Sequence, residues 1–159
     1  GLLLGLLAAG CSDLATDSPL AHARRSPEAL ARAALGAIET GDAERLAELM
    51  ITREEYETLL WPVLPDREQM PFDFAWSYTA PRSRNARRAA IERYEGVPLE
   101  LERVDLGEEV ERYESFALYR RSRMWVRRPD TGEVGMLPLM DTLVEMEGGW
   151  KFMNFVDDA

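Results

Sequence analysis

The hydrophobic pattern of this chain changes its period at Gly96, and this change constrains the fold more than any other feature. Before Gly96, apolar residues recur at the spacing of amphipathic helices. After it, apolar and polar residues alternate in runs that turn signals separate. Helices that precede strands in this way predict an α+β fold, with N-terminal helices packed on one face of an antiparallel sheet.

Three N-capping residues predict three helices in the first part of the chain. Ser26 and Asp42 each stand directly before a run with helical spacing, and Gly41 ends the first of these helices. Thr52 and Glu55 have the spacing of a capping box, in which each side chain accepts a hydrogen bond from the other residue's backbone N–H. A third helix is therefore expected after Thr52.

The next stretch, residues 62–81, is rich in proline. Proline lacks the backbone N–H that a helix interior needs, so we expect a loop there, with one short helical piece at 72–79. A separate helix is predicted over 83–94, where helical spacing resumes.

The C-terminal part is predicted to form strands joined by turns. In the first strand the apolar phase shifts between Leu101 and Val104, which predicts a β-bulge. Glycine-containing turns separate the runs. The predicted strands are 97–106, 113–128, 133–146 and 150–156.

Residues 1–10 form an apolar run without a charge, and Cys11, the only cysteine, ends it. A membrane-spanning helix needs roughly 20 apolar residues, and this run has only the length of a signal-peptide core. Small residues precede Cys11, and the junction resembles the lipobox of bacterial lipoproteins. The resemblance implies that Cys11 is lipidated and becomes the mature N-terminus. The alternative is a buried N-terminal element in which Cys11 is merely a small apolar residue.

This resemblance divides the chain into three regions. Residues 1–10 are expected to be the remnant of a signal peptide, and residues 11–25 the lipidated cysteine with a polar tether. Residues 26–159 are expected to form one domain. The implied location is the bacterial cell envelope, as a membrane-anchored lipoprotein at the outer membrane or facing the periplasm.

Charge and rare residues exclude several function classes. The formal net charge is −10, which argues against nucleic acid as a partner. His22 is the only histidine and lies in the predicted tether, so Ser-His or Cys-His catalysis and histidine-rich metal sites are excluded inside the domain. We therefore expect neither a metal nor a cofactor. Lys151 is the only lysine, which we interpret as codon bias of a GC-rich genome.

Two stretches resemble the nuclear transport factor 2-like superfamily. One is the helix break at 38–46, Ile-Glu-Thr-Gly-Asp-Ala-Glu-Arg-Leu, and the other is the ending at 145–152, Glu-Met-Glu-Gly-Gly-Trp-Lys-Phe. The resemblance implies a cone-shaped fold over 26–159, whose curved sheet wraps a cavity that the helices cover. The superfamily includes ketosteroid isomerases, polyketide cyclases and many non-enzymatic secreted domains, so the resemblance leaves the activity open.

Polar residues on an otherwise apolar strand face are the candidates for such a cavity. Arg120 and Ser122 interrupt an apolar face of one predicted strand, and Asp141 is the only charge on a face of the next. A guanidinium and a carboxylate in one cavity could bind an anionic or polar ligand, and Asp141 is a weak candidate for a general base. The alternatives are that a bulge turns Arg120 outward, or that the two charges form a buried structural pair.

An aromatic cluster and an acidic cluster in the strand region each lead to one prediction. Tyr113, Tyr119 and Trp125 fall on the strand face opposite Arg120 and form a possible homodimer interface, as sheets of this superfamily often dimerise through their outer face. The acidic residues Glu108, Glu109 and Glu111 are interpreted as a solvated hairpin rather than a calcium site.

Three functions from different classes follow from these features. The first is a lipid-anchored binding or interaction module for a small ligand or a partner protein, without catalysis. The second is an isomerase, dehydratase or cyclase that uses a pocket carboxylate as its base. The third is a purely structural dimer at the membrane surface.

Overall fold

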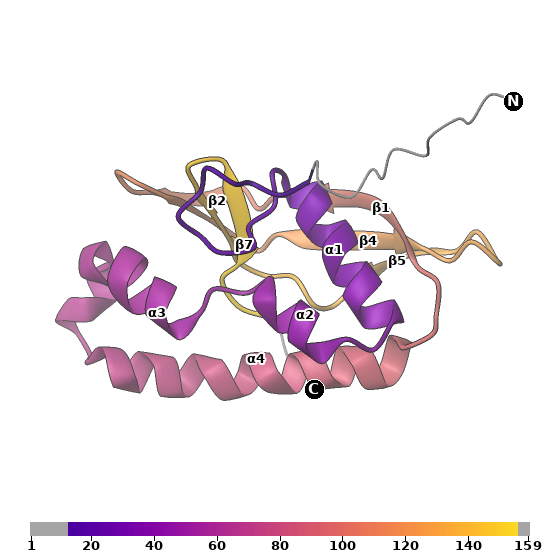
Figure 1. Ribbon diagram of the computed structural model, residues 1–159, viewed down its shortest axis with the longest axis horizontal. Coiled ribbons are helices and arrows are strands. Elements are labelled where there is room, and N and C mark those ends of the chain that lie inside the picture. The colour runs from indigo at the N-terminus through magenta and orange to yellow at the C-terminus, as the bar shows by residue number, and fades with distance from the viewer. Residues whose placement is uncertain (1–12, 156–159) are drawn as a thin grey trace, which may run out of the picture.

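Helices precede strands along the chain, as the change of pattern at Gly96 predicts, and the fold is α+β (Figure 1). The computed structural model describes residues 13–155. Figure 1 shows the short helices lying alongside one long helix, with the strands on their other side. The helical elements are α1 (Pro27–Glu39), α2 (Ala43–Glu48), α3 (Arg53–Glu55), the π-helix η1 (Tyr56–Leu60), the 3₁₀ helices η2 (Trp61–Val63) and η3 (Pro65–Glu68), and α4 (Phe72–Tyr94).

The three predicted N-caps are confirmed. The Ser26 side chain accepts a hydrogen bond from the backbone N–H of Ala29 at 3.0 Å, at the start of α1. Asp42 caps α2 in the same way, and Gly41 before it has a φ of 68°, a conformation that favours glycine. Both hydrogen bonds of the Thr52–Glu55 capping box are present at the start of α3. These caps depend on neighbouring residues alone, which is why the sequence reveals them.

The prediction of two separate helical pieces around Pro81 is wrong. Residues 72–94 form the single helix α4, and Pro81 lies inside it. A proline in a helix interior costs about 3 kcal/mol, so packing elsewhere along the helix has to offset it. Ser83 and Ala86 are buried, and Ser83 Oγ accepts a hydrogen bond from the backbone N–H of Phe155 at 3.3 Å. Tertiary contacts therefore keep the helix continuous where the sequence indicates a break.

The strands are all paired antiparallel, and they form two sheets with no strand in common. One sheet has the order β1-β4-β5 and the other β2-β3-β6-β7. The register of β1 against β4 shifts between Leu101 and Arg103, which confirms the predicted bulge. The strands are β1 (Glu100–Asp105), β2 (Glu109–Arg112), β3 (Ala117–Arg120), β4 (Arg123–Arg127), β5 (Val134–Leu137), β6 (Leu143–Met146) and β7 (Gly149–Phe152).

Each of the two long predicted strands is broken at its middle. The strand predicted over 113–128 becomes β3 and β4, because Arg121 adopts a φ of 57° between them. The strand predicted over 133–146 becomes β5 and β6. The backbone N–H of Ser122 donates to the carbonyl of Asp141 at 2.8 Å, so the two breaks lie side by side. The sheet bends at this line, and β2 is an additional strand that the sequence did not predict.

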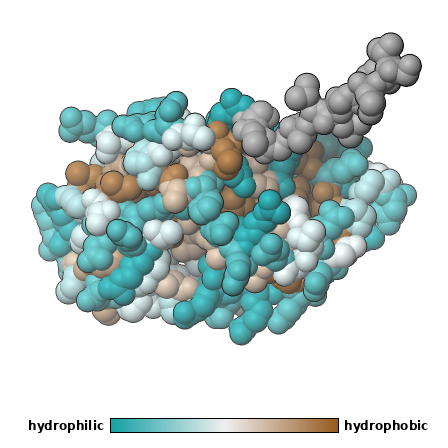
Figure 2. All heavy atoms as spheres, viewed as in Figure 1, coloured by the Kyte–Doolittle hydropathy of each residue, from teal (hydrophilic) through white to brown (hydrophobic). Residues whose placement is uncertain are grey.

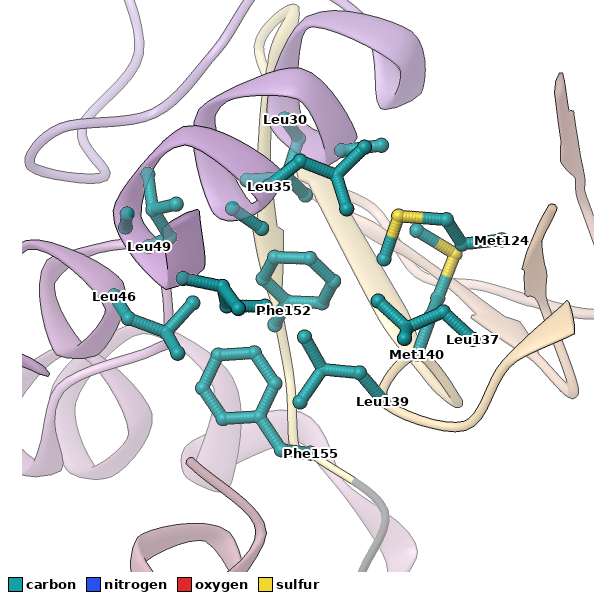
Figure 3. Close-up of a cluster of buried hydrophobic side chains, with 14 of the residues drawn as sticks. Leu30, Leu35, Leu46, Leu49, Met124, Leu137, Leu139, Met140, Phe152 and Phe155 are labelled. Carbon is teal, nitrogen blue, oxygen red and sulfur yellow. The ribbon is translucent and has the colours of Figure 1, made fainter. Parts of the chain in front are cut away.

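Buried apolar side chains form two clusters, one on each face of the β2-β3-β6-β7 sheet. The larger one joins α1, α2 and the β1-β4-β5 sheet around Phe152 and Phe155 (Figure 3). The smaller one lies between the other face and η1, and it includes Tyr56, Leu60 and Leu118. Figure 2 shows that hydrophilic side chains cover most of the face seen in Figure 1, with smaller apolar patches among them.

Residues 13–25 pack on the domain and do not form a free tether, which corrects the predicted boundary at residue 26. Leu20 and Ala23 are buried, each with 2% of its surface exposed. Arg24 and Trp150 exchange two backbone hydrogen bonds of 3.1 and 2.8 Å, and Ser18 Oγ donates to the carbonyl of Met146 at 2.7 Å. The polar composition of the segment hides the two apolar side chains that anchor it.

A buried ion pair holds this segment to the helices and to β7. Lys151 Nζ lies 3.0 and 3.3 Å from the two carboxylate oxygens of Glu55, and the lysine has no exposed surface. Glu55 also accepts hydrogen bonds from the backbone N–H groups of Ala21 at 2.8 Å and Thr52 at 2.9 Å. The single lysine therefore has a structural role, and its interpretation as codon bias misses that role.

Cys11 and the predicted signal peptide remnant lie outside the described residues. Within residues 13–155, no helix combines the length and the apolar character that crossing a bilayer requires.

Candidate functional site

A cavity of about 330 Å³ opens between the π-helix η1, the short helix η3 and one face of the β2–β3 hairpin. The hairpin contributes Glu111, Tyr113 and Arg120 to its wall, and the helical side contributes Tyr56 and Asp66. Cavities that bind small ligands fall in a range of about 300–1,000 Å³. The cavity thus has the size of a site for a small molecule.

Strand register brings the polar side chains of the hairpin together. Glu111 pairs with Leu118 across the ladder, and Arg120 stands two residues beyond Leu118 on the same face. Arg120 Nε and Nη2 contact the two carboxylate oxygens of Glu111 at 2.5 and 3.2 Å, and Tyr113 Oη donates to Glu111 Oε2 at 3.1 Å. We call Arg120, Glu111 and Tyr113 the hairpin triad. It is a bidentate, charge-assisted arrangement, so each side chain is held in place before any ligand arrives.

The π-helix supplies the opposite wall of the cavity. Tyr56 is buried, and its ring packs edge-on against Trp61 and Phe72, with centroids 5.9 and 5.6 Å away. Burial raises the pKa of the Tyr56 hydroxyl, and the nearby carboxylate of Asp66 raises it further. Tyr56 therefore presents a neutral hydroxyl at neutral pH, one that can donate or accept a hydrogen bond.

Arg120 and Glu111 carry opposite charges, so the formal charge of the hairpin triad is zero. The hydrogen bond from Arg120 holds the pKa of Glu111 below its ordinary value of 4.5, although burial opposes this. The same bond raises the pKa of Arg120. With Asp66 added, one arginine and two carboxylates line the cavity, so its formal charge is −1. Such a site does not favour an anion, in contrast to the anionic ligand considered from the sequence.

Only one of the three predicted ligand-binding residues lines this cavity. Arg120 does, paired with Glu111, whereas Ser122 and Asp141 are absent from its wall. Ser122 is buried at the bend of the sheet, where its hydroxyl accepts from the N–H of Gly107 and donates to the carbonyl of Tyr119, both at 3.1 Å. The backbone carbonyl of Asp141 accepts a hydrogen bond from the N–H of Ser122 at the same bend. The bend breaks the alternation from which the shared face was predicted.

The predicted interface residues do not share one face either. Tyr113 lies on the same side as Arg120, because the turn from Tyr113 to Phe116 closes the hairpin and keeps both side chains on the cavity face. Tyr119 packs on Trp150 with ring centroids 4.9 Å apart, against the larger apolar cluster. Trp125 lies in the β1-β4-β5 sheet, where the guanidinium carbon of Arg103 is 4.5 Å from the centroid of its ring. The three aromatic residues therefore do not form the single patch from which a homodimer was predicted.

Sequence reasoning missed Glu111, Tyr113, Tyr56 and Asp66 as cavity residues. The interpretation of Glu111 as part of a solvated hairpin overlooked a usable signal, since Glu111 and Tyr113 stand two residues apart, the spacing that places side chains on one face of an extended chain. Tyr56 and Asp66 come from helical segments that only the tertiary fold brings to the hairpin. Within residues 13–155, no three His, Cys, Asp or Glu side chains are grouped so as to hold a metal ion.

Comparisons of this chain with protein-family models, with curated proteins and with solved structures found no match.

Proposed function

We propose that this protein is a lipid-anchored binding module of the cell envelope, with a cone-shaped nuclear transport factor 2-like fold, which holds a small polar ligand in the cavity described above. The hairpin triad carries the proposal, because three hydrogen-bonding side chains are already oriented at the wall of an open cavity. A fold of helices on a curved antiparallel sheet is compatible with the superfamily.

The charges of the cavity define the ligand class. Its formal charge of −1 favours a neutral ligand or one with a single positive charge, and its carboxylates favour a ligand that donates hydrogen bonds. Small polyols and amines have this chemistry. Catalysis by Asp141 is not part of the proposal, because that side chain does not line the cavity, and the pKa of Glu111 is lowered, which makes it a weak base.

Native mass spectrometry of the protein purified from its own host tests the ligand. We expect a retained small-molecule mass in the wild type, and a bound fraction at least about tenfold lower in Glu111→Gln, because a charged acceptor of the ligand's hydrogen bonds is removed. Tyr119→Phe is the matched control, since Tyr119 does not line the cavity. A bare wild-type mass, or equal retention in Glu111→Gln, would contradict the proposal.

The anchor has its own test. Cys11→Ser is expected to abolish incorporation of a radiolabelled fatty acid and to leave the precursor unprocessed, because the sulfur atom of Cys11 is the atom that would be lipidated. Ser12→Ala, one residue further on, is the control and should label normally. A Cys11→Ser protein that still incorporates label would remove the anchor from the proposal.

The packing of residues 13–25 gives this anchor a structural consequence. Asp13 stands two residues after Cys11, so the lipidated cysteine would lie within about 7 Å of a residue that belongs to the folded domain. The domain would then sit directly on the bilayer. In Figure 1 the described chain begins on the opposite side from α4, so α4 would face away from the membrane.

A further inference from the structure

A second hollow, which the proposed function does not use, lies between α4 and the segment that joins α2 to α3. It has a volume of about 260 Å³ and shares no lining residue with the cavity of the hairpin triad. Met50, Ile51 and Trp76 give it an apolar floor, and Arg84 and Arg87 line it from α4. We call it the α4 groove.

The two arginines project into the groove from one side of α4. They are three residues apart, and Ala80, four residues before Arg84, lines the groove with them. Alanine at that position leaves the space above the floor open. Arg53 enters from the other wall, where it pairs with Asp73.

Arg84 and Arg87 lack a counter-charge in the part of the chain that the structure describes. Neither forms an ion pair or a side-chain hydrogen bond with residues 13–155, although the whole chain has 29 acidic and 19 basic residues. Arg87 is also half-buried. Burial lowers the pKa of its guanidinium, and the positive charge of Arg84 lowers it further. Two neighbouring cations over an apolar floor form a site that a bound anion would stabilise.

We propose that the α4 groove binds a small organic oxyanion. The phosphate or carboxylate head lies between Arg84 and Arg87, and the apolar body lies on Met50, Ile51 and Trp76. Guanidinium groups match the geometry of phosphate and carboxylate oxygens, which supports an oxyanion over a halide. The volume of the groove fits a body of about one aromatic ring.

Calorimetric titration with phenyl phosphate, benzoate and the neutral benzyl alcohol tests this site. The wild type should bind at least one of the two anions more tightly than benzyl alcohol. In an NMR titration with that anion, the indole N–H signal of Trp76 should shift. The variant Arg84→Gln/Arg87→Gln should bind that anion at least about tenfold more weakly, because two charged hydrogen-bond donors are lost. Preference for phenyl phosphate or for benzoate identifies the head group.

The control variant Arg82→Gln/Arg88→Gln changes the charge of the same helix equally. Arg82 lies over the ring of Tyr78 and Arg88 bonds Asn85, so neither lines the groove. It should bind the anion as the wild type does. Equal losses of anion affinity in both double variants would show a general charge effect and would overturn the proposal. A wild type that binds neither anion would also overturn it.

The chain's own acidic end gives a further arm of the test. Phe155 contacts Ser83 of α4, and Asp157 and Asp158 follow it in the sequence. If the wild type binds no probe while Asp157→Asn/Asp158→Asn binds one, then the acidic end of the chain occupies the groove. That result would overturn an external ligand.

Discussion

Replacing Glu55 with alanine is expected to lower the free energy of unfolding by about 3–5 kcal/mol, as measured by urea denaturation, because it leaves a buried charge without its partner. Lys151 has no exposed surface, and Glu55 provides the only carboxylate within ion-pair distance of it among residues 13–155. The same change removes the partner of the backbone N–H groups of Ala21 and Thr52. One side chain thus joins the N-terminal segment, α3 and β7.

The pH dependence of this loss identifies its cause. Burial lowers the pKa of Lys151, and the charge of Glu55 opposes that effect, so the Glu55→Ala variant should have a lower lysine pKa still. Between the lowered pKa of the folded state and the ordinary lysine pKa, the folded state then binds fewer protons than the unfolded state, so stability rises with pH in that range. The deficit of the variant should therefore shrink between pH 7 and pH 9. A deficit that does not change with pH would mean that lost packing, not the buried charge, causes it.

Two variants serve as controls for the Glu55 result. Glu54→Ala changes the neighbouring exposed carboxylate of α3 and should alter stability by less than about 0.5 kcal/mol. Glu55→Ala/Lys151→Met removes both charges and should recover part of the loss, because an apolar side chain replaces the uncompensated lysine. No recovery in the double variant would assign the loss to the capping box and to the contact with Ala21.

Replacing Gly107 with alanine is expected to lower the free energy of unfolding by about 3 kcal/mol, at the upper end of overpacking costs. A Cβ atom at Gly107 would overlap the backbone carbonyl of Arg120, which cannot move without displacing β3. The N–H of Gly107 also donates to Ser122 Oγ at the bend. Because Arg120 belongs to the hairpin triad, the substitution should also weaken ligand binding.

Gly135→Ala is the matched control for Gly107. Nothing lies within 4 Å of a Cβ built at Gly135 in β5. Without a clash, this change should leave the free energy of unfolding within about 0.5 kcal/mol of the wild type. Similar losses at both positions would show that the cost comes from the loss of glycine in general and not from the close approach of Arg120.

The sequence predicted features that depend on near neighbours. Ser26, Asp42 and the Thr52–Glu55 box could be identified because a cap is formed within one helical turn. The phase shift in β1 likewise identified a bulge that is local to one strand. The α+β order followed from the same periodicities.

Other features were decided by contacts between distant segments. Lys151 and Glu55 are 96 positions apart, and no local pattern indicates that they meet. Pro81 stays inside α4 because Ser83 and Ala86 are held by the core.

The candidate site shows the same division. Alternation along one strand predicted that Arg120 faces a cavity, and Arg120 does line one. The same alternation extended that face to Ser122, across a bend that Arg121 creates. Asp66 and Tyr56 enter the site only when the helical segment folds over the hairpin. The sequence by itself therefore determined the caps, the bulge and the order of elements, because each arises from bonds between near neighbours. Only the tertiary structure decided which charges meet, because burial and sheet curvature depend on segments far apart in the chain.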